Sequence, residues 1–296
     1  MQNHPLSKSK MKLAIASASG SFKGAFTHGV LTALESAGIR ADAYAASSSS
    51  VMPTAWAAIG KTAELGVNYW LKGMEELQKP EMGMSQVTMG GIKFFNPPLD
   101  KLLAAETPEY FIATSAVITS EAASQTQGEK ARRLGRKLLV SAAKKDRSWV
   151  NENLQTVLFS TRRNGIYSKI DENNFDDIAY ATSRMLHAWD IPAWINEKPY
   201  IDASYTCLCP AIEMIDAGYK QVIAINNEPG IFYRDMFGLE IIPESDRGVD
   251  IHIIKPDTDP KEMGVDFTNA TPEGLLAVYQ HGEEKGRGFL AKWGNS

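Results

Sequence analysis

The chain has 296 residues, 44% of them hydrophobic and 22% charged, so it can bury about three quarters of the surface that its unfolded form exposes. This composition excludes a predominantly disordered protein. Its 31 Lys and Arg against 35 Asp and Glu leave a net charge of −4, which excludes a protein whose main partner is a nucleic acid.

No segment approaches the roughly 18 consecutive apolar residues that cross a bilayer. Lys8, Lys10 and Lys12 precede a run of small apolar residues. That run is too short for a secretory signal and is better explained as a buried first strand. We therefore expect a cytoplasmic protein or one that contacts a membrane peripherally, while secretion without a cleaved signal peptide stays open.

Short apolar runs alternate with helical patterns from residue 11 onward, which is typical of βαβ units. We expect a disordered N-terminus over residues 1–10 and a single α/β domain over residues 11–296. This domain is predicted to be a three-layer α/β/α fold with a mainly parallel central sheet. The helix after the first strand ends at Gly38, where a left-handed backbone is needed. The predicted strands span residues 11–18, 42–46, 110–119, 154–161, 198–202, 221–226 and 250–255.

Two segments interrupt this alternation, and each is a candidate cover for a site. Residues 77–99 are rich in Met, Gly and Pro, and we predict a long loop there. Residues 121–150 are predicted to form a basic, lid-like helical insertion, with eight Lys and Arg against three Asp and Glu between 121 and 147. This helix is either a solvated surface helix or, through residues 130–147, a peripheral contact with anionic lipid headgroups.

A run of small residues, Ala46-Ser47-Ser48-Ser49-Ser50, lies where the second predicted strand gives way to a helix. A sharp turn at such a junction exposes one side chain at the carboxyl edge of a sheet, as in a Gly-x-Ser-x-Gly nucleophile elbow. Taken alone, a serine run before a helix is more often a capping loop.

Two other turns carry polar groups of the same kind. Ser19-Gly20-Ser21-Phe22-Lys23-Gly24 follows the first strand, where backbone N–H groups can converge on an anion. Tyr200-Ile201-Asp202-Ala203-Ser204 places a lone carboxylate after a short strand. Each turn is ambiguous by itself, since an Asp in this position is usually a turn or cap residue.

Together, in this order and spacing, the three segments resemble the patatin-like phospholipase family. Its blocks are a Gly-rich turn with Arg or Lys, a Gly-x-Ser-x-Gly elbow, and Asp-Gly-Gly or Asp-Gly-Ala. The resemblance covers about residues 13–60 and 175–226. It implies that Ser48 is the nucleophile and Asp202 its dyad partner. It also implies that Ser19, Gly20 and Ser21 form the oxyanion hole, with Lys23 and Gly24 supporting the turn.

The chemistry suits a serine acyl hydrolase that cleaves lipid carboxylic esters. A buried Asp202 with a raised pKa can accept the Ser48 proton, and the Gly20 and Ser21 N–H groups can hold the oxyanion. This mechanism needs no metal or other cofactor. Phospholipid is the substrate class that the resemblance implies.

The chain departs from the family pattern at five glycine positions, now Ser19, Ser21, Ala46, Ser50 and Ala203. Each departure can cost roughly 1 kcal/mol of backbone strain or misaim a donor, and Pro53 predicts an elbow helix that begins late or bends. A catalytically degenerate relative that binds lipid or a protein partner is therefore the leading alternative.

A Ser-Asp-His triad esterase using His252 or His281 is a second alternative, because both histidines follow Asp202 in the chain. His28 is interpreted as a packing residue. Cys207 and Cys209, one residue apart, are predicted to be buried free thiols, since no neighbouring His or Cys completes a zinc site.

Overall fold

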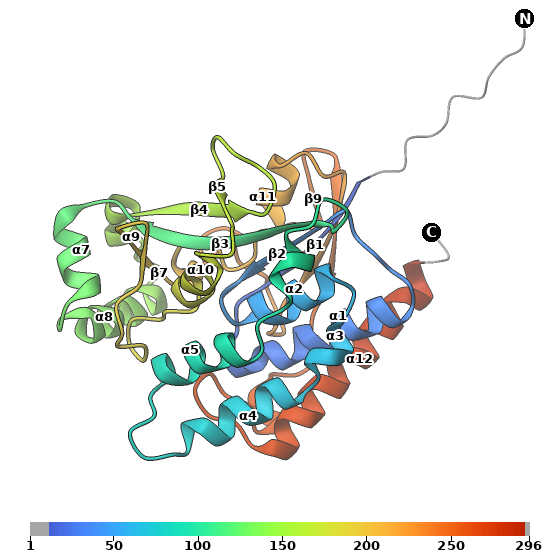
Figure 1. The fold of residues 1–296 in the computed structure, drawn as a ribbon, viewed down its shortest axis with the longest axis horizontal. Coiled ribbons are helices and arrows are strands. Elements are labelled where there is room, and N and C mark those ends of the chain that lie inside the picture. Colours follow the sequence, from blue (N-terminus) through green and yellow to red (C-terminus); the bar gives the residue numbers. More distant parts are fainter. Residues whose placement is uncertain (1–11, 294–296) are drawn as a thin grey trace, which may run out of the picture.

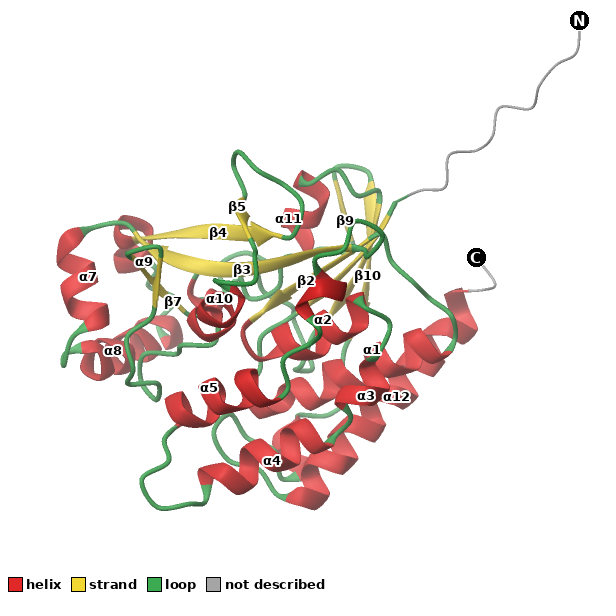
Figure 2. Ribbon diagram, viewed as in Figure 1, coloured by secondary structure: helices red, strands yellow, loops and turns green. Residues whose placement is uncertain are grey.

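A computed structural model describes residues 12–293 of the chain. A mixed, mostly parallel sheet lies between helices on both of its faces, so the fold has the three layers predicted from the sequence (Figures 1 and 2). Along the sheet the strands follow the order β5-β4-β3-β2-β1-β8-β10-β9, and β7 pairs with both β3 and β6. The predicted disordered N-terminus, residues 1–10, lies outside the described residues.

All seven predicted strands are present. They are β1 (Leu13–Ser17), β2 (Ala43–Ser47), β3 (Glu109–Val117), β4 (Leu154–Ser160), β7 (Lys198–Ile201), β8 (Gln221–Ile225) and β10 (Val249–Ile254). The parallel core pairs β1 with β2 and β8, in a register that sets Ser17 opposite both Ala46 and Ile225. Three two-residue strands had no sequence signal: β5 (Ser168–Lys169), β6 (Trp194–Ile195) and β9 (Ser245–Asp246).

Helices fill the connections between the strands. The α-helices are α1 (Ala25–Ser36), α2 (Val51–Ala58), α3 (Thr62–Leu65), α4 (Asn68–Leu77), α5 (Met84–Phe94), α6 (Leu99–Leu102), α7 (Ser120–Gln127), α8 (Ala131–Ala143), α9 (Ser148–Asn153), α10 (Phe175–Thr182), α11 (Ala211–Asp216) and α12 (Pro272–Trp293). Short 3₁₀ helices occur at η1 (Ser21–Gly24), η2 (Ser48–Ser50), η3 (Ala203–Tyr205) and η4 (Pro260–Met263). No helix of the described chain combines the length and apolarity needed to span a membrane.

The two faces of the sheet bury different cores because successive side chains of a strand point to opposite sides. In β2, Tyr44 and Ala46 join the core shared with α1, α2, α10 and α12. Ala43 and Ala45 join the core shared with α11. The small alanines of β2 therefore allow helices to pack closely on both faces of the sheet near the carboxyl end of this strand.

Residues 77–99 do not form the long loop predicted from their composition. α5 occupies the middle of the segment, with Met84, Val87 and Ile92 buried. The Gly83 N–H donates to the Gln86 side chain at 3.1 Å, which satisfies one of the free donors at the start of the helix. Tertiary packing and this cap outweigh the poor helix propensity of Gly90 and Gly91.

Residues 121–150 form three helices, α7, α8 and α9, at one end of the sheet (Figure 1). An apolar stripe runs along α8, where Leu138 is buried and Leu134 and Ala142 pack against the core. Gly135 lies against the backbone of the 183–191 loop, since a Cβ there would be 2.4 Å from His187 N.

Helices α1 and α12 cross at glycines. A Cβ on Gly282 would lie 2.1 Å from the Phe26 carbonyl oxygen, and one on Gly29 would lie 1.9 Å from that of Tyr279. Backbone oxygens cannot move aside as a flexible side chain can, so the two helices reach this separation because glycine is present at both contacts. α12 thereby packs tightly against α1, the helix that follows residues 19–24, which we call the glycine turn.

Replacing Gly282 by Ala should therefore lower the free energy of unfolding by about 3 kcal/mol, because the added methyl group overpacks the crossing. The matched control is Gly288→Ala in the same helix, where a Cβ meets nothing within 4 Å. This control should be neutral or stabilising by up to about 1 kcal/mol. Urea denaturation measures both, and equal effects of the two substitutions would contradict the close crossing.

Candidate active site

The serine run forms a strained elbow at the carboxyl end of β2. Ser48 is buried and adopts a φ of 54°, in the left-handed region that non-glycine residues rarely occupy. Its N–H donates to Thr182 Oγ1 at 2.9 Å, and Thr182 in turn donates to the Ala113 carbonyl on β3. The neighbouring strand and helix α10 thus hold the elbow in a conformation that costs energy locally.

Ser48 and Asp202, 154 residues apart, are in direct contact. The Ser48 Oγ donates to Asp202 Oδ2 at 2.8 Å. The other carboxylate oxygen accepts from Ser204 N at 2.7 Å and from Ser204 Oγ at 2.6 Å. Asp202 is 1% exposed. Burial raises its pKa to about 6, against the opposing effect of the hydrogen bonds from Ser204 and Ser48.

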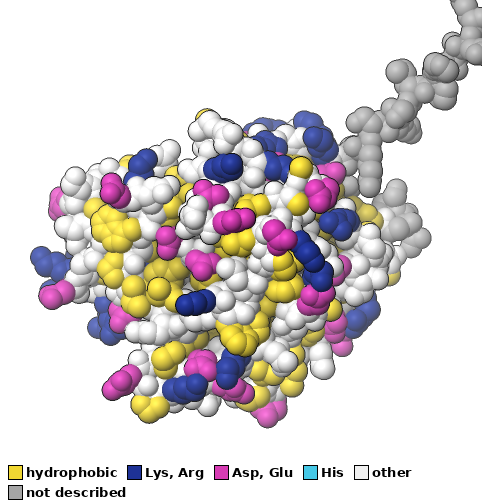
Figure 3. All heavy atoms as spheres, in the orientation of Figure 1, with side chains coloured by type: hydrophobic (Ala, Val, Ile, Leu, Met, Phe, Trp, Pro, Cys, Tyr) yellow, Lys and Arg dark blue, Asp and Glu magenta, His cyan; other side chains and the backbone are white. Residues whose placement is uncertain are grey.

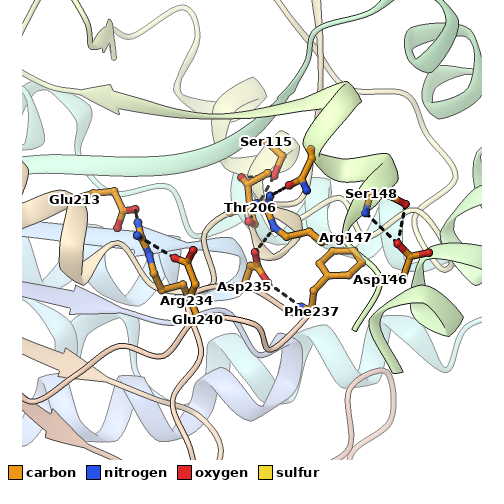
Figure 4. A network of polar contacts seen from close by, with 12 residues as sticks. Ser115, Asp146, Arg147, Ser148, Thr206, Glu213, Arg234, Asp235, Phe237 and Glu240 are labelled. Atoms are coloured by element: carbon orange, nitrogen blue, oxygen red, sulfur yellow. Dashed lines mark hydrogen bonds and ion pairs between the residues drawn. The ribbon is translucent and has the colours of Figure 1, made fainter. Parts of the chain in front are cut away.

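The chain behind Asp202 is held by a polar network (Figure 4). Ser115 Oγ on β3 donates to the Asp202 carbonyl at 2.7 Å and lies 2.9 Å from Thr206 Oγ1. Met236 N donates to the Ser204 carbonyl at 3.0 Å. An ion pair of 2.5 Å between Arg147 and Asp235 connects the loop that contains Asp235 and Met236 to the start of α9. Contacts from β3 and from the loop of residues 226–244 therefore hold the backbone that carries the Asp202 carboxylate.

The glycine turn presents backbone donors beside this pair. Ser19 N–H is engaged with the Leu208 carbonyl at 2.9 Å. Within the described chain, the N–H groups of Gly20 and Ser21 donate to no other group. Of the three residues predicted for the oxyanion hole, Gly20 and Ser21 thus keep free N–H groups, whereas Ser19 takes part through its side chain, which contacts Ser204 Oγ at 2.8 Å.

Asn227, which the sequence analysis did not single out, holds the glycine turn in place. Its Nδ2 donates to the carbonyls of Ala18 and Ser19 at 2.8 and 3.1 Å, and its Oδ1 accepts from Thr27 N and Oγ1. A Cβ on Gly20 would lie 2.9 Å from the Asn227 Cβ. The polar pair Asn226-Asn227 after β8 was the available signal, because ligand sites of parallel sheets lie at the carboxyl ends of the strands.

Lys23 and Gly24 lie on the far side of the turn. Lys23 Nζ contacts Glu228 at 2.8 Å and Asp259 at 3.0 Å. Burial opposes the Lys23 charge, but these two carboxylates outweigh it and raise the pKa of the amine. A Cβ on Gly24 would lie 2.8 Å from the Trp70 ring and 2.9 Å from Ser49 Oγ. Lys23 and Gly24 thus hold the glycine turn in place and do not contact Ser48 or Asp202.

Of the five substituted glycine positions, Ser21 alone has a left-handed backbone, with a φ of 48°. Two of the substituted serines make new tethers: Ser50 Oγ donates to the Ala18 carbonyl at 2.5 Å, and Ser19 contacts Ser204. Pro53 is accommodated because the elbow helix begins late, at Val51, so that Pro53 lies in its first turn where no N–H partner is needed.

An apolar cavity of about 230 Å³ opens at Ser48. Ser21 and Ser48 line it, and α4 and α5 supply most of the wall through Tyr69, Trp70, Met84, Val87 and Phe94, with Phe95 just after α5. The expected cover from residues 77–99 is present as a helical wall. No residue of 121–150 is among those that line this cavity, and the lid-like role of the basic insertion stays a prediction.

The histidines lie apart from the dyad. His252 on β10 packs against Phe289 and Trp293, and His281 on α12 accepts from Asp257 N. Both Asp202 oxygens are taken by Ser48 and Ser204, which leaves no place for an imidazole between Ser48 and Asp202. His28 is a packing residue, as expected: it is fully buried between Trp70 and the Thr62 carbonyl, and burial lowers its pKa to about 4.

Cys207 and Cys209 are buried free thiols, as predicted. Burial raises the pKa of both thiols well above the usual range. Ser47 Oγ donates to the Cys207 carbonyl at 2.9 Å, which joins the elbow strand to the segment after Asp202. The described residues contain no group of three or more His, Cys, Asp and Glu arranged to hold a metal ion.

The comparisons with known proteins agree with this architecture. No family model and no curated protein matches the sequence. Among solved structures, human GIVD cytosolic phospholipase A2 superposes with a TM-score of 0.51 at 10% identity, over 95% of this chain and 59% of that one. The fold is the patatin-like one. VipD from Legionella pneumophila also matches, with a TM-score of 0.46 at 10% identity, over 96% of this chain and 67% of that one.

The raised pKa of Asp202 predicts a pH-dependent stability. The folded chain releases the Asp202 proton near pH 6 and the unfolded chain near 3.8. The stabilising contribution of the protonated carboxyl is therefore complete below pH 3.8 and is lost as the pH rises through 6. An amide in place of this carboxyl would have no such proton to lose.

The free energy of unfolding of Asp202→Asn, relative to that of the unsubstituted chain, should therefore rise on the order of 3 kcal/mol between about pH 4 and 7. Denaturant titrations at several pH values measure this difference. Ser204→Ala, which keeps the carboxyl, is the control. A difference between Asp202→Asn and the unsubstituted chain that stays flat with pH would contradict the buried, raised-pKa carboxyl.

Proposed function

We propose that this chain is a serine acyl hydrolase that cleaves carboxylic esters of lipids through Ser48 and Asp202. The observation that carries the proposal is the direct Ser48–Asp202 hydrogen bond at a strained elbow that opens into an apolar cavity. A strained backbone, a buried acid with a raised pKa and a hydroxyl within its reach rarely occur together for structural reasons alone.

In the proposed reaction, Asp202 takes the proton of Ser48 Oγ as that oxygen bonds to the ester carbonyl carbon. The carbonyl π electrons move to the oxygen, and the Gly20 and Ser21 N–H groups stabilise the resulting oxyanion. Collapse of this intermediate breaks the ester C–O bond, and the alcohol leaves with the proton from Asp202. Water, deprotonated by Asp202, then attacks the acyl group on Ser48, releasing the carboxylic acid and restoring the hydroxyl.

Two features support a lipid as the substrate. Aromatic, Met and Val side chains dominate the cavity wall, which suits an acyl chain better than a polar substrate. The human structure with the same fold is named a phospholipase A2. At 10% identity the shared fold carries no activity with it, so the substrate class is part of the proposal.

Ser48→Ala should lose at least about 10³-fold in kcat/KM on an ester substrate, and should no longer react with a fluorophosphonate probe. Asp202→Asn, which keeps the hydroxyl but lacks the base, should label far more slowly than the unsubstituted chain. Mass spectrometry of the labelled peptide locates the adduct. An unsubstituted chain that neither labels nor hydrolyses esters would identify a binding protein with the same pocket, and labelling that survives Ser48→Ala would reject Ser48 as nucleophile.

The pH profile tests the role of Asp202 separately. Because the base must be deprotonated, kcat/KM should rise about tenfold per pH unit below pH 6, the pKa of the buried carboxyl, and level off above it. Far-ultraviolet circular dichroism over the same range checks that the chain stays folded. A rate independent of pH between about 5 and 8 would exclude Asp202 as the base.

A further inference from the structure

The exposed side of α8 gathers cations that form no ion pair within the described residues. Arg132, Arg133, Arg136 and Lys137 are all exposed and lie within two turns. Together with Lys130, they make no ion pair or hydrogen bond to a carboxylate within the described chain. Arg132 with Arg136, and Arg133 with Lys137, are like-charge pairs at i and i+4, which cost a helix a few tenths of a kcal/mol each.

Two exposed aliphatic side chains lie one turn beyond these two pairs of cations, on the same side of α8. Leu139 is 37% exposed and lies seven residues after Arg132, and Val140 is 55% exposed and lies seven after Arg133. We call the surface formed by Arg132, Arg133, Arg136, Lys137, Leu139 and Val140 the basic face. Figure 3 shows cationic side chains at the edge of the molecule where α7 and α8 lie.

A hollow beside the basic face is lined by cations and an amide. Lys130, Arg133 and Lys137, with Gln125 from α7 and Leu134, enclose a volume of about 290 Å³, and no carboxylate lines it. Glu121 and Glu152 line a neighbouring hollow with Lys137 without forming an ion pair with it. Three cations converging on one hollow suit a phosphate group.

The loop that follows α10 links α8 to the cavity at Ser48. α8 rests on the backbone of Leu186 and His187. Two residues further on, Trp189 lines the cavity and donates to Thr88 Oγ1 of α5 at 2.8 Å. On α5, Met89 is 43% and Phe94 78% exposed. Helices α5 and α8 lie on the same side of the molecule (Figures 1 and 2).

We propose that the basic face of α8 docks on a bilayer that contains anionic phospholipids. A headgroup phosphate occupies the hollow of Lys130, Arg133 and Lys137, and Leu139 and Val140 enter the interface. Charge complementarity carries this assignment, and the exposed aliphatic pair favours a membrane over a nucleic acid. The idea that docking brings ester lipids to Ser48 rests on the proposed function. The docking itself does not depend on that function.

The test uses the full chain with Ser48→Ala, so that the vesicles are not hydrolysed. Binding is measured by sedimentation with vesicles of phosphatidylcholine alone or of phosphatidylcholine mixed with phosphatidylglycerol. The quadruple variant R132Q/R133Q/R136Q/K137Q should bind the anionic vesicles roughly 1,000-fold more weakly. The matched control K12Q/R40Q/K169Q/K220Q removes four exposed cations near the amino ends of the strands and should bind like the parent. L139S/V140S should weaken binding about tenfold.

Equal binding by the quadruple variant and its control would overturn the proposal, as would equal binding to neutral and anionic vesicles. So would a quadruple variant that loses affinity for a single-stranded RNA but not for vesicles. A thermal melt checks folding, and the double variant R132Q/R136Q replaces the quadruple one if that variant unfolds. If the Ser48→Ala chain binds anionic vesicles while the unsubstituted chain hydrolyses no ester, the proposed function is rejected and the docking surface stands.

Discussion

The burial of one carboxylate, that of Asp202, is the constraint on which the rest of the site depends. A carboxylate with 1% exposure is tolerated when hydrogen bonds replace the water it has lost, and here two come from Ser204 and one from Ser48. Its own backbone is held by Ser115 and by the Arg184 carbonyl. The proton affinity of the acid and the direction of the Ser48 hydroxyl are therefore set by the same few contacts.

The serines that replace glycines change how the site is held. Glycine permits an unusual backbone, whereas serine adds a hydroxyl that can fasten it. Ser50 bonds to the turn after β1, and Ser19 reaches Ser204, so that elbow, turn and acid form one hydrogen-bonded unit. Ser21 keeps a left-handed backbone without a glycine, and Asn227 holds the turn that places it there.

The sequence predicted the strands and the meeting of Ser48 with Asp202 because both depend on signals carried along the chain: apolar runs, small residues at turns, and the order of three segments. α5 was missed because its cap and its tertiary packing, not its composition, make it helical. Thr182 and Ser204 carry no distinctive local pattern, and Asn227 has only the weak signal of a polar pair after a strand. Their importance comes from partners that are distant in sequence or set by the turn.

The order in which the site's parts occur along the chain matters during synthesis. Ser48 leaves the ribosome long before Thr182, Asp202 and Asn227, and α12, which clamps α1, comes last. A nascent chain thus carries the Ser48 hydroxyl without the Asp202 carboxylate and without the Asn227 amide that holds the turn. On the proposed chemistry, the growing polypeptide is inert toward lipids, and reactivity begins only when the segments that carry Asp202, Asn227 and α12 have been made and folded.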